Sequence, residues 1–585
     1  MRKWLTRVVA GVLACASMLS IAACGSNGDK AFSEFLESVG GAGDSAGGNG
    51  GGAIEKVIDP TKTQLLVKTY TAGFGDEWMY DLEARFEEAY KNVSYEDGKT
   101  GIQVWHTGDM KSNYTAQDII AGSYDVYFME NASYYALTKE EGALENLTDI
   151  VTTPNADDGG KTILSKLTQQ QKSFYGRTGT DGDPKYYAIP HYEGGWGLIY
   201  NKELFDAKNY YMADVPAGEG ARIVADANET KGKGPDGVAG TSDDGLPRTY
   251  EEFFILCDEI AARGDIPFCW SGQYREPYLT TFMNTLVAEY CGVDQMELNL
   301  TFEGEAEELV VFDENGAIVY ENGEVKTERL AITPESGAEI SRQAGKLYAL
   351  QFLEKMLTTD GYFNKKTSLN ATHSHTAAQE NFLKAGTKFS TEKSAYAMLI
   401  DGPWWEAEAT SVYTLMGIQD ANYTKKNRDF AWMPMPKATE AKVGTKNIYI
   451  DTLNAITCVK SGLGPKKQAA LDFVKFSATD ESLIKFTQIT GALKSFNYTL
   501  NEEQKSVLSP FAQSVINYKE TAATFVMNSG NDFYVSNTTA FNVSSYYPST
   551  GGWANPVACF NAGEKTSEEY FKDMVAHWRN ASIWG

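Results

Sequence analysis

The chain contains 585 residues, of which 42% are hydrophobic and 12% aromatic, enough for about two to four domains with large cores. Its formal net charge of −26 would repel a polyanion, so the composition excludes nucleic acid as an expected partner. After residue 23, no stretch approaches the roughly 18 consecutive apolar residues of a membrane-spanning helix.

The first 24 residues predict export. A basic start precedes the unbroken small and apolar run Val8–Ala23, which has the anatomy of a signal peptide. The run ends in Ile21-Ala-Ala-Cys24, which resembles the lipobox of bacterial lipoproteins, a family in which this cysteine receives the lipid. We expect a signal peptide over residues 1–23 and a lipid on Cys24, tethering the protein to the outer face of the bacterial cell membrane. The alternative is an ordinary secretory signal with a chance cysteine.

Residues 24–57 predict a flexible leash, because this Gly- and Ser-rich stretch has too few large apolar residues to offset chain entropy. It contains Gly43-Asp-Ser-Ala-Gly47, which matches the G-x-S-x-G pattern of serine hydrolases. That motif needs a strand before it and a helix after it, and this composition supports neither. We therefore exclude it as a nucleophile.

Strand and helix signals then alternate. Strands are expected at 65–70, 101–105 and 124–128, and helices at 76–90 and 116–121. This order predicts a mainly parallel sheet with right-handed crossovers. Ligands of such sheets lie at the carboxyl ends of the strands, so Phe74, Asp76, Glu130 and Asn131 are candidate ligand-binding residues.

Loops that combine aromatic and polar residues follow. Sugar rings present apolar C–H faces and a belt of hydroxyl groups, so they are bound by flat aromatic side chains together with carboxylates and amides. The candidate residues in these loops are Tyr192, Glu193, Trp196, Trp270, Tyr274, Arg275, Glu276, Trp404, Trp405 and Trp553. Trp404 follows a Gly-Pro turn, which is expected to hold its indole at the wall of a cleft. For each single aromatic residue, packing in the core remains the alternative.

An acidic insertion, residues 226–245, combines carboxylates with turn-forming glycines. Calcium needs several hard oxygen ligands from a flexible backbone, so a structural calcium ion is one interpretation of this loop. The expected ligands are Asp226, Asn228, Asp236, Asp243 and Asp244. A solvated acidic turn is the other interpretation, since the spacing is not that of an EF-hand. A second insertion, 296–332, predicts hairpin strands.

The remaining cysteines and histidines point to no metal or redox site. Cys257, Cys269, Cys291, Cys458 and Cys559 form no C-x-x-C pair, and both one disulfide and buried free thiols remain open. His373 and His375 lie in a polar stretch with no third ligand nearby in the sequence. No cofactor is expected other than the calcium ion.

A series of motifs along residues 62–585 resembles one known family, the sugar-binding proteins of ABC transporters (extracellular solute-binding protein, family 1). The motifs occur in the order of that family: Tyr187–Pro190, Gly195–Phe205, Thr249–Phe254, Glu276-Pro-Tyr278, Gln379–Phe382, Ala395–Met398, Asp401-Gly-Pro-Trp-Trp405, Phe430–Pro436 and Thr487–Ser495. The resemblance implies an α/β, two-lobed, periplasmic-binding-protein-like fold of type II, with hinge-linked lobes and a ligand cleft between them. It also adds Tyr278 to the candidate ligand contacts.

From the resemblance we expect the following organisation. Residues 58–186 and 453–512 form the first lobe, and residues 187–452 and 513–585 form the second. The protein is expected to be a monomeric binding lipoprotein that hands an oligosaccharide to permease subunits in the membrane. The alternatives are a secreted glycoside hydrolase, which would need two facing carboxylates among residues such as Glu130, Glu193, Glu276 and Glu406, and a surface glycan adhesin or sensor.

Overall fold

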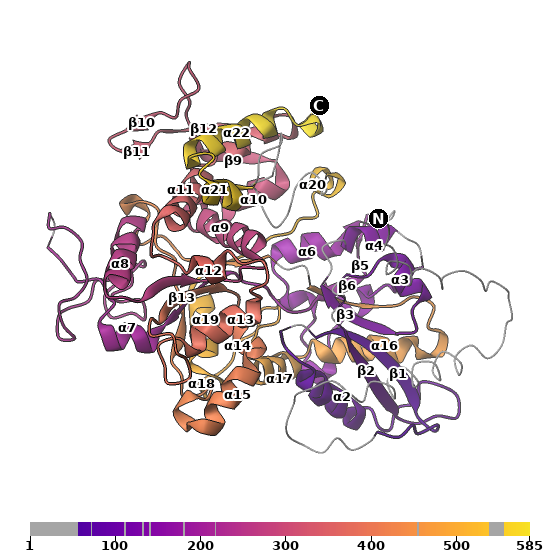
Figure 1. The fold of residues 1–585 in the computed structure, drawn as a ribbon. Coiled ribbons are helices and arrows are strands. Elements are labelled where there is room, and N and C mark those ends of the chain that lie inside the picture. Colours follow the sequence, from indigo (N-terminus) through magenta and orange to yellow (C-terminus); the bar gives the residue numbers. More distant parts are fainter. Residues whose placement is uncertain are drawn as a thin grey trace, which may run out of the picture. The chain divides into compact units, whose positions relative to one another are not determined.

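The computed structural model describes residues 56–584 apart from 72, 110, 112, 131–133, 140–141, 179–181, 217, 453–454 and 538–554 (Figure 1). The described residues belong to one compact unit. The predicted signal peptide, Cys24 and nearly all of the leash lie outside them. No helix among the described residues is long and apolar enough to cross a membrane.

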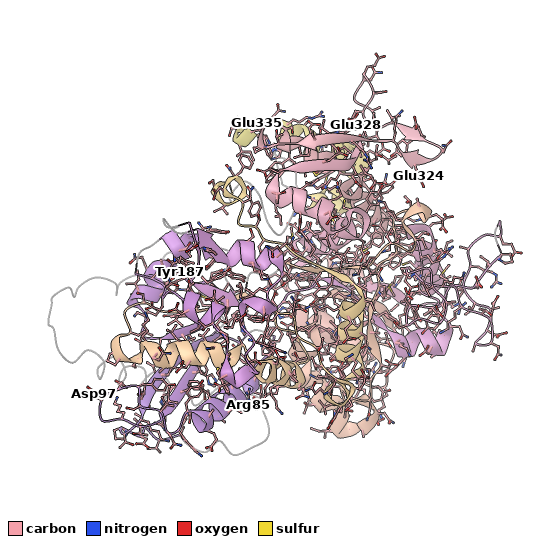
Figure 2. All side chains as sticks on the ribbon, turned by 180° about the vertical axis from the view of Figure 1, so that it is seen from behind. Arg85, Asp97, Tyr187, Glu324, Glu328 and Glu335 are labelled. Carbon is pink, nitrogen blue, oxygen red and sulfur yellow. The ribbon has the colours of Figure 1, made fainter. Side chains whose placement is uncertain are left out.

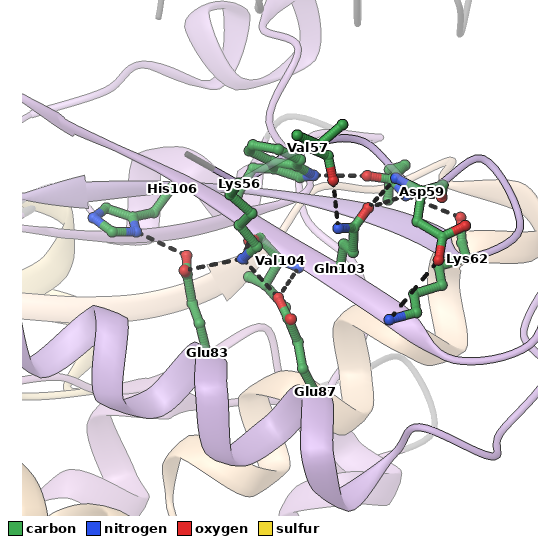
Figure 3. Close-up of polar contacts among 11 residues, drawn as sticks. Lys56, Val57, Asp59, Lys62, Glu83, Glu87, Gln103, Val104 and His106 are labelled. Carbon is green, nitrogen blue, oxygen red and sulfur yellow. Dashed lines mark hydrogen bonds and ion pairs between the residues drawn. The ribbon is translucent and has the colours of Figure 1, made fainter. Parts of the chain in front are cut away.

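The first described residues form ion pairs and hydrogen bonds with a helix and with a strand of a sheet (Figure 3). Lys56 Nζ lies 2.7 Å from Glu87 Oε1 and also donates to the carbonyl oxygen of Val104. Glu83, on the same helix as Glu87, accepts from Lys56 and lies 2.7 Å from Nδ1 of His106. The folded chain therefore includes residues 56 and 57, which the sequence assigned to the leash.

A five-stranded sheet organises the first lobe. Its order is β2 (Ile102–Asp109), β1 (Thr63–Tyr70), β3 (Val126–Glu130), β16 (Ala455–Val459) and β6 (Ala188–Pro190). β1 is parallel to β2 and β3, whereas β16 is antiparallel to β3 and β6. The carboxyl ends of β1, β2, β3 and β6 therefore share one edge of the sheet.

Amphipathic helices cover this sheet. α2 (Glu77–Ala89) buries Trp78, Leu82 and Phe86 at helical spacing, and the Phe86 ring centroid lies 5.0 Å from that of Phe473 on α16. The helices around the sheet are α3 (Ala116–Ala121), α4 (Tyr134–Lys139), α5 (Thr148–Thr152), α6 (Gln169–Tyr175), α16 (Lys467–Ser477) and α17 (Asp480–Thr490). A small hairpin pairs β4 (Gly176–Thr178) with β5 (Pro184–Tyr186).

A four-stranded sheet organises the second lobe, with the order β14 (Phe430–Met433), β7 (Gly197–Asn201), β13 (Tyr396–Asp401) and β8 (Ile266–Cys269). β7 runs antiparallel to both β13 and β14, and β13 is parallel to β8. Every residue of β7 and β13 is buried, because helices lie on both faces. The carboxyl ends of β8, β13 and β14 meet the amino end of β7 at one edge.

The helices of the remaining chain are α7 (Lys202–Lys208), α8 (Tyr250–Ala262), α9 (Arg275–Cys291), α10 (Val293–Thr301), α11 (Ala344–Thr358), α12 (Lys365–Ser368), α13 (His375–Lys384), α14 (Trp405–Glu408), α15 (Thr410–Gln419), α18 (Glu502–Ser506), α19 (Pro510–Thr521), α20 (Asp532–Ser536), α21 (Pro556–Ala562) and α22 (Ser567–Arg579). α9 buries residues around its whole circumference, as expected for a helix in the middle of a core. The two sheets thus have separate hydrophobic cores, which confirms the mixed α/β fold class.

Chain segments that link the sheets meet at a buried carboxylate. Asp451, at the end of β15 (Ile448–Asp451), accepts hydrogen bonds from the Gly194 amide at 2.9 Å and the Ser495 hydroxyl at 2.8 Å. β15 pairs in parallel with β17 (Ala523–Val526). Burial, reinforced by the charge of Glu193, raises the pKa of Asp451 to about 7. Asp451, Gly194 and Ser495 thus join three of the segments that link the two sheets.

The second insertion differs from its prediction in detail. Residues 296–301 belong to α10, and the hairpin begins only at β9 (Gly304–Val310), which pairs antiparallel with β12 (Thr327–Ile332). The short strands β10 (Tyr320–Glu321) and β11 (Glu324–Val325) pair beyond it; Figure 2 labels Glu324 on β11 and Glu328 on β12. All five cysteines after residue 56 are free thiols, so no disulfide forms among them.

Candidate functional site

The first lobe presents polar aromatic and acidic side chains at the edge where its strands end. Glu130 is the last residue of β3, and Tyr192, two residues after β6, donates its hydroxyl hydrogen to Glu130 Oε1. Tyr70 ends β1. Burial raises the pKa of Tyr70, and the nearby carboxylates of Glu130, from the first lobe, and Glu408, from the second, raise it further.

The second lobe presents a group of aromatic rings. The Trp404 ring centroid lies 5.1 Å from that of Trp196, and Trp196 lies 4.5 Å from Tyr278, both at edge-to-face angles. Trp196 is held through its carbonyl oxygen, which accepts a hydrogen bond from Thr285 on α9. A Cβ at Gly402 would lie 2.2 Å from the indole of Trp404, so this ring can rest on the turn only because residue 402 is glycine.

Two carboxylates lie beside these rings and share one amide. Gln379 Nε2 donates to Asp401 Oδ2 at 3.0 Å and to Glu408 Oε2 at 2.6 Å. Asp401 ends β13, and Glu408 ends the short helix α14 that follows Trp404. Burial raises the pKa of both carboxyl groups, and the charge of Glu408 raises that of Asp401 further. His375 Nε2 lies 3.7 Å from Glu408 Oε1.

The two groups of residues face each other across the lobes. A Cβ built on Gly73, in the loop after β1, would lie 3.4 Å from Trp404 Cβ and 3.5 Å from Glu408 Oε1. Trp404 also packs against the hydrophobic core of the first lobe. The Tyr274 ring stacks on that of Tyr278, with 6.3 Å between their centroids. We call this set the inter-lobe site: Tyr70, Glu130, Tyr192, Trp196, Tyr274, Tyr278, Gln379, Asp401, Trp404 and Glu408.

The family is decided by a comparison with protein-family models. Residues 68–483, most of the chain, match the model for bacterial extracellular solute-binding proteins. The chain belongs to this family. As a member, it is a binding protein that acts outside the cytoplasm. A comparison with curated proteins gave no match.

This solute-binding protein is similar to solved structures over nearly the whole length of those structures. One comes from work on xylan utilization by the thermophilic bacterium Caldanaerobius polysaccharolyticus, with 15% identity, 88% of this chain and 99% of that chain covered, and a TM-score of 0.50. Others are the solute-binding protein RafE in complex with raffinose (14%, 88% and 99%, 0.47) and a chitin oligosaccharide binding protein (14%, 89% and 99%, 0.49). The first of these likenesses supports the two-lobed fold.

Several predicted site residues lie in the core instead. Trp270 is fully buried, and its Nε1 donates to the carbonyl oxygen of Ser368 at 3.0 Å. Trp405 is fully buried among Phe382, Phe430 and Phe511. The prediction that Trp270 and Trp405 form ligand platforms is therefore wrong. Because neighbouring residues of a helix point in different directions, only Trp404 of the Trp404-Trp405 pair faces the site.

Phe74 and Glu193, which were predicted to bind the ligand, also lie in buried surroundings. The Phe74 ring packs at 4.7 Å from Tyr192 and 5.8 Å from Phe486, inside the core of the first lobe. Glu193 is buried and forms an ion pair with Lys519. Both residues support the surfaces next to the site. Lys519 pairs with Oε2 of Glu193, whereas Oε1 is buried and has no hydrogen-bond partner among the described residues.

Arg275 and Glu276 contact the protein itself. Arg275 Nη1 donates to the carbonyl oxygens of Gly272 and Leu369 at 3.4 and 3.3 Å. Glu276 Oε2 accepts from Nδ2 of Asn555, the residue that caps α21, at 2.6 Å. These contacts direct the two side chains to the surrounding loops.

Asp76 precedes α2 at the β2 side of the first sheet edge. Its Oδ1 atom is buried and has no hydrogen-bond partner among the described residues. Burial raises the pKa of Asp76, and the nearby His106 opposes that rise. Asp76 thus remains a candidate ligand contact. Asn131 and Trp553 lie outside the described residues.

The acidic insertion does not fit the predicted calcium site. Asp226 and Asp236 accept from the backbone amides of Asn228 and Val238 at 2.7 Å, and Asp244 accepts from that of Gly240 at 2.7 Å. Asp243 accepts from Thr241 and from the Asp236 amide. In the described part of the chain, no three His, Cys, Asp or Glu side chains gather where they would hold a metal ion. The carboxylates instead stabilise the turns of their own loop.

Sequence reasoning missed Tyr70, Gln379, Asp401 and Glu408 as site residues. Gln379 and Asp401 stood inside the motifs that carried the family resemblance, but they were not singled out. Glu408 follows Trp404 by four positions, a spacing that puts two residues on the same face of a helix. That spacing was a usable signal once a helix was expected after the Gly-Pro turn.

Proposed function

We propose that this solute-binding protein captures an oligosaccharide outside the cell and delivers it to the permease of an ABC importer. One observation carries the proposal: flat indole and phenol rings and hydrogen-bonding carboxylates from both lobes lie together in the inter-lobe site. A pyranose ring stacks its C–H face on an aromatic ring and directs its hydroxyl groups to carboxylate and amide oxygens. Several rings favour a chain of sugar units over a single one.

The two-lobed architecture supplies the mechanism. A sugar that contacts Glu130 and Tyr192 on one lobe and Trp404 and Glu408 on the other stabilises the closed arrangement of the lobes. The permease then receives the loaded, closed form. A lipid on Cys24 would keep the protein, as a monomer, next to that permease.

A thermal-shift panel tests the proposal. The purified protein without residues 1–23 is incubated with cellotetraose, xylotetraose, maltotetraose, N-acetylchitotetraose and raffinose, and with amino acids and a pentapeptide as controls. A ligand at 100 times its Kd raises the free energy of unfolding by about 2.7 kcal/mol. Stabilisation by at least one saccharide and by none of the controls is expected, and stabilisation by a peptide alone would overturn the proposal.

The same incubations separate binding from hydrolysis. We expect chromatography of the saccharides after prolonged incubation to show no cleavage products, because binding without chemistry explains the site. Release of shorter saccharides by the wild-type protein would instead favour the glycoside hydrolase alternative. A metal-dependent change in melting temperature is not expected, given the geometry of the acidic insertion.

A further inference from the structure

The charged groups of the inter-lobe site are all acidic. Glu130, Asp401 and Glu408 contribute three carboxyl groups, and among the described residues no Lys or Arg stands next to them as a counter-charge. His375, 3.7 Å from Glu408, is the one basic side chain of the described chain that lies beside this group. Arg275, the nearest arginine in the sequence to the site residue Tyr274, donates to main-chain carbonyl oxygens.

The neutral amide between the carboxylates adds another acceptor. Gln379 uses its Nε2 to donate to both Asp401 and Glu408. Its Oε1 atom is buried, in a residue with 0% exposure, and has no partner in the described part of the chain. A buried carbonyl oxygen without a donor is costly, so a donor that reaches it after the surrounding side chains rearrange around a ligand would be favoured.

The site therefore presents hydrogen-bond acceptors, which bind donor groups of a ligand. Its carboxylates also carry negative charge, which favours ligand groups that are neutral or positively charged. Sugar hydroxyl and ammonium groups donate hydrogen bonds, whereas an ionised carboxylate or sulfate only accepts them. Placing such an anion beside Asp401 and Glu408 adds like-charge repulsion in a poorly solvated place.

We propose that the inter-lobe site selects saccharides without acidic groups, uncharged or amine-bearing, and excludes uronates and sulfated sugars; the inference rests on the proposed saccharide-binding function. The acidic groups come from both lobes, so the exclusion acts when the lobes close on the ligand. An acidic sugar that touches one lobe would still meet the carboxylate of the other.

Matched ligands test the selection by calorimetry at pH 8, above the raised pKa of Asp401 and Glu408. One series has a β-1,4-linked glucose backbone: cellotetraose, the tetramer of glucosamine, and the tetramer whose C6 groups are oxidised to carboxylates. A second series compares xylotetraose with the same chain carrying a glucuronate, which adds one acidic group to a pentose backbone. Maltotetraose, raffinose and tetragalacturonate widen the range of backbones. The tightest uncharged or amine-bearing ligand is expected to bind at least about ten-fold more tightly than its acidic counterpart.

Glu408→Gln tests the cause. At pH 8, above the raised pKa of Glu408, this variant keeps the shape of the side chain and the contact with Gln379 but removes a negative charge. It should therefore reduce the affinity ratio between the uncharged and the acidic ligand several-fold. Glu502→Gln, a carboxylate with a 92% exposed side chain, is the matched control and should leave the preference unchanged. Circular dichroism and melting temperature establish that each variant is folded.

The outcomes distinguish this inference from the proposed function. If an acidic saccharide binds more tightly than its neutral counterpart, the protein remains a saccharide-binding protein and the selection rule is overturned. An unchanged preference in folded Glu408→Gln would also overturn it, because the charge would then not be the cause. If no saccharide of any charge binds, the proposed function itself falls, and the inference falls with it.

Discussion

Trp404 and Trp270 show how two tryptophans in similar loop contexts take different roles. Trp404 is half-buried, rests on Gly402 and meets the other lobe, whereas Trp270 is fully buried and hydrogen-bonded to a main-chain carbonyl. Both follow the carboxyl end of a strand of the second sheet. Which of them faces the site depends on the direction of the side chain, and that direction is set by tertiary packing.

For Trp404, we predict a loss of ligand affinity. Trp404→Ala should weaken binding of the best saccharide from the panel by about 1–3 kcal/mol, the usual cost of removing an aromatic anchor from a desolvated contact. Trp404→Phe keeps an aromatic face and should lose less. Calorimetry on both folded variants is the measurement; unchanged affinity in Trp404→Ala would return this residue to a purely structural role.

For Trp270, we predict the opposite pattern. Trp270→Phe removes the donor to Ser368 and leaves a buried carbonyl oxygen without its partner, which should lower the free energy of unfolding by about 1–3 kcal/mol. Because Trp270 presents no face to the site, the affinity of the folded variant should match that of the wild type. Urea unfolding and calorimetry together test this. A large loss of affinity with unchanged stability would contradict the core assignment.

At the scale of elements, the one-turn helix α14 carries a carboxyl group in a core. Glu406 is buried, and its Oε2 accepts from the Ser509 hydroxyl group. Burial raises the pKa of Glu406 to about 7, from an ordinary value of 4.5. The folded protein therefore holds this proton over a pH range in which the unfolded chain releases it. Its contribution to stability is complete below about pH 4.5 and is lost as the pH rises through about 7.

Glu406→Gln should flatten this pH dependence. Between pH 5 and pH 8 the wild-type free energy of unfolding should fall, and the variant should fall less, by an amount of up to roughly 3 kcal/mol. Urea titrations at pH 5, 6, 7 and 8 measure the difference. Glu502→Gln, which changes an exposed carboxylate, is the control. If the free energy of unfolding changed with pH equally in the wild type and in Glu406→Gln, ionising the carboxyl group of Glu406 would cost the folded protein little free energy.

Most elements of the first sheet were predictable from the sequence. The strand predicted at 65–70 and the helix predicted at 76–90 appear as β1 and α2 because apolar residues at strand or helix spacing pack on one core. The start of the second insertion was misplaced, since Met296, Leu298 and Leu300 belong to a helix that packs on the second core. Apolar residues that alternate with polar ones, as at 296, 298 and 300, favour a strand, and packing on the core overrides that signal here.

The candidate site was only partly predictable. Glu130, Tyr192, Trp196, Tyr278 and Trp404 were named from their positions at strand ends or in motifs, and the structure brings them together. The proximity of Asp401 and Glu408 was not predicted. It depends on Gln379, which comes from a separate helix and donates a hydrogen bond to both carboxylates. The expected convergence of the acidic insertion is not seen in the described part of the chain, because its carboxylates accept hydrogen bonds from amides and a hydroxyl group of the same loop. Calcium binding by this loop stays a prediction.

At the scale of the whole molecule, the loop after β1 lies where the two lobes meet. Gly73 has φ of +80° and faces Trp404 and Glu408, whereas a Cβ added at Gly98, where φ is +77°, would meet no heavy atom within 4 Å. The two glycines share the same backbone requirement and differ in what lies opposite. Asparagine tolerates this backbone region better than most residues, so it is a suitable probe at both positions.

Gly73→Asn should reduce saccharide affinity, because its side chain would occupy space between the lobes. Gly98→Asn should cost a similar amount of stability and leave the affinity unchanged. Calorimetry with the best ligand, and X-ray scattering with and without it, check the prediction: the ligand should compact the wild type and Gly98→Asn more than Gly73→Asn. Equal affinity and equal compaction in both variants would mean that the loop does not limit closure.

The position of β16 in the first sheet has a consequence for the order in which the protein is made and exported. β16 lies between β3 and β6, yet its residues, 455–459, come more than 260 positions after the end of β6 at Pro190. Chains emerge from the ribosome and cross the membrane with the N-terminus first, so β3 and β6 arrive long before the strand that joins them. During that interval β3 has an unpaired edge open to other chains. The first lobe, although it begins first, is completed only after the central sheet of the second has left the ribosome.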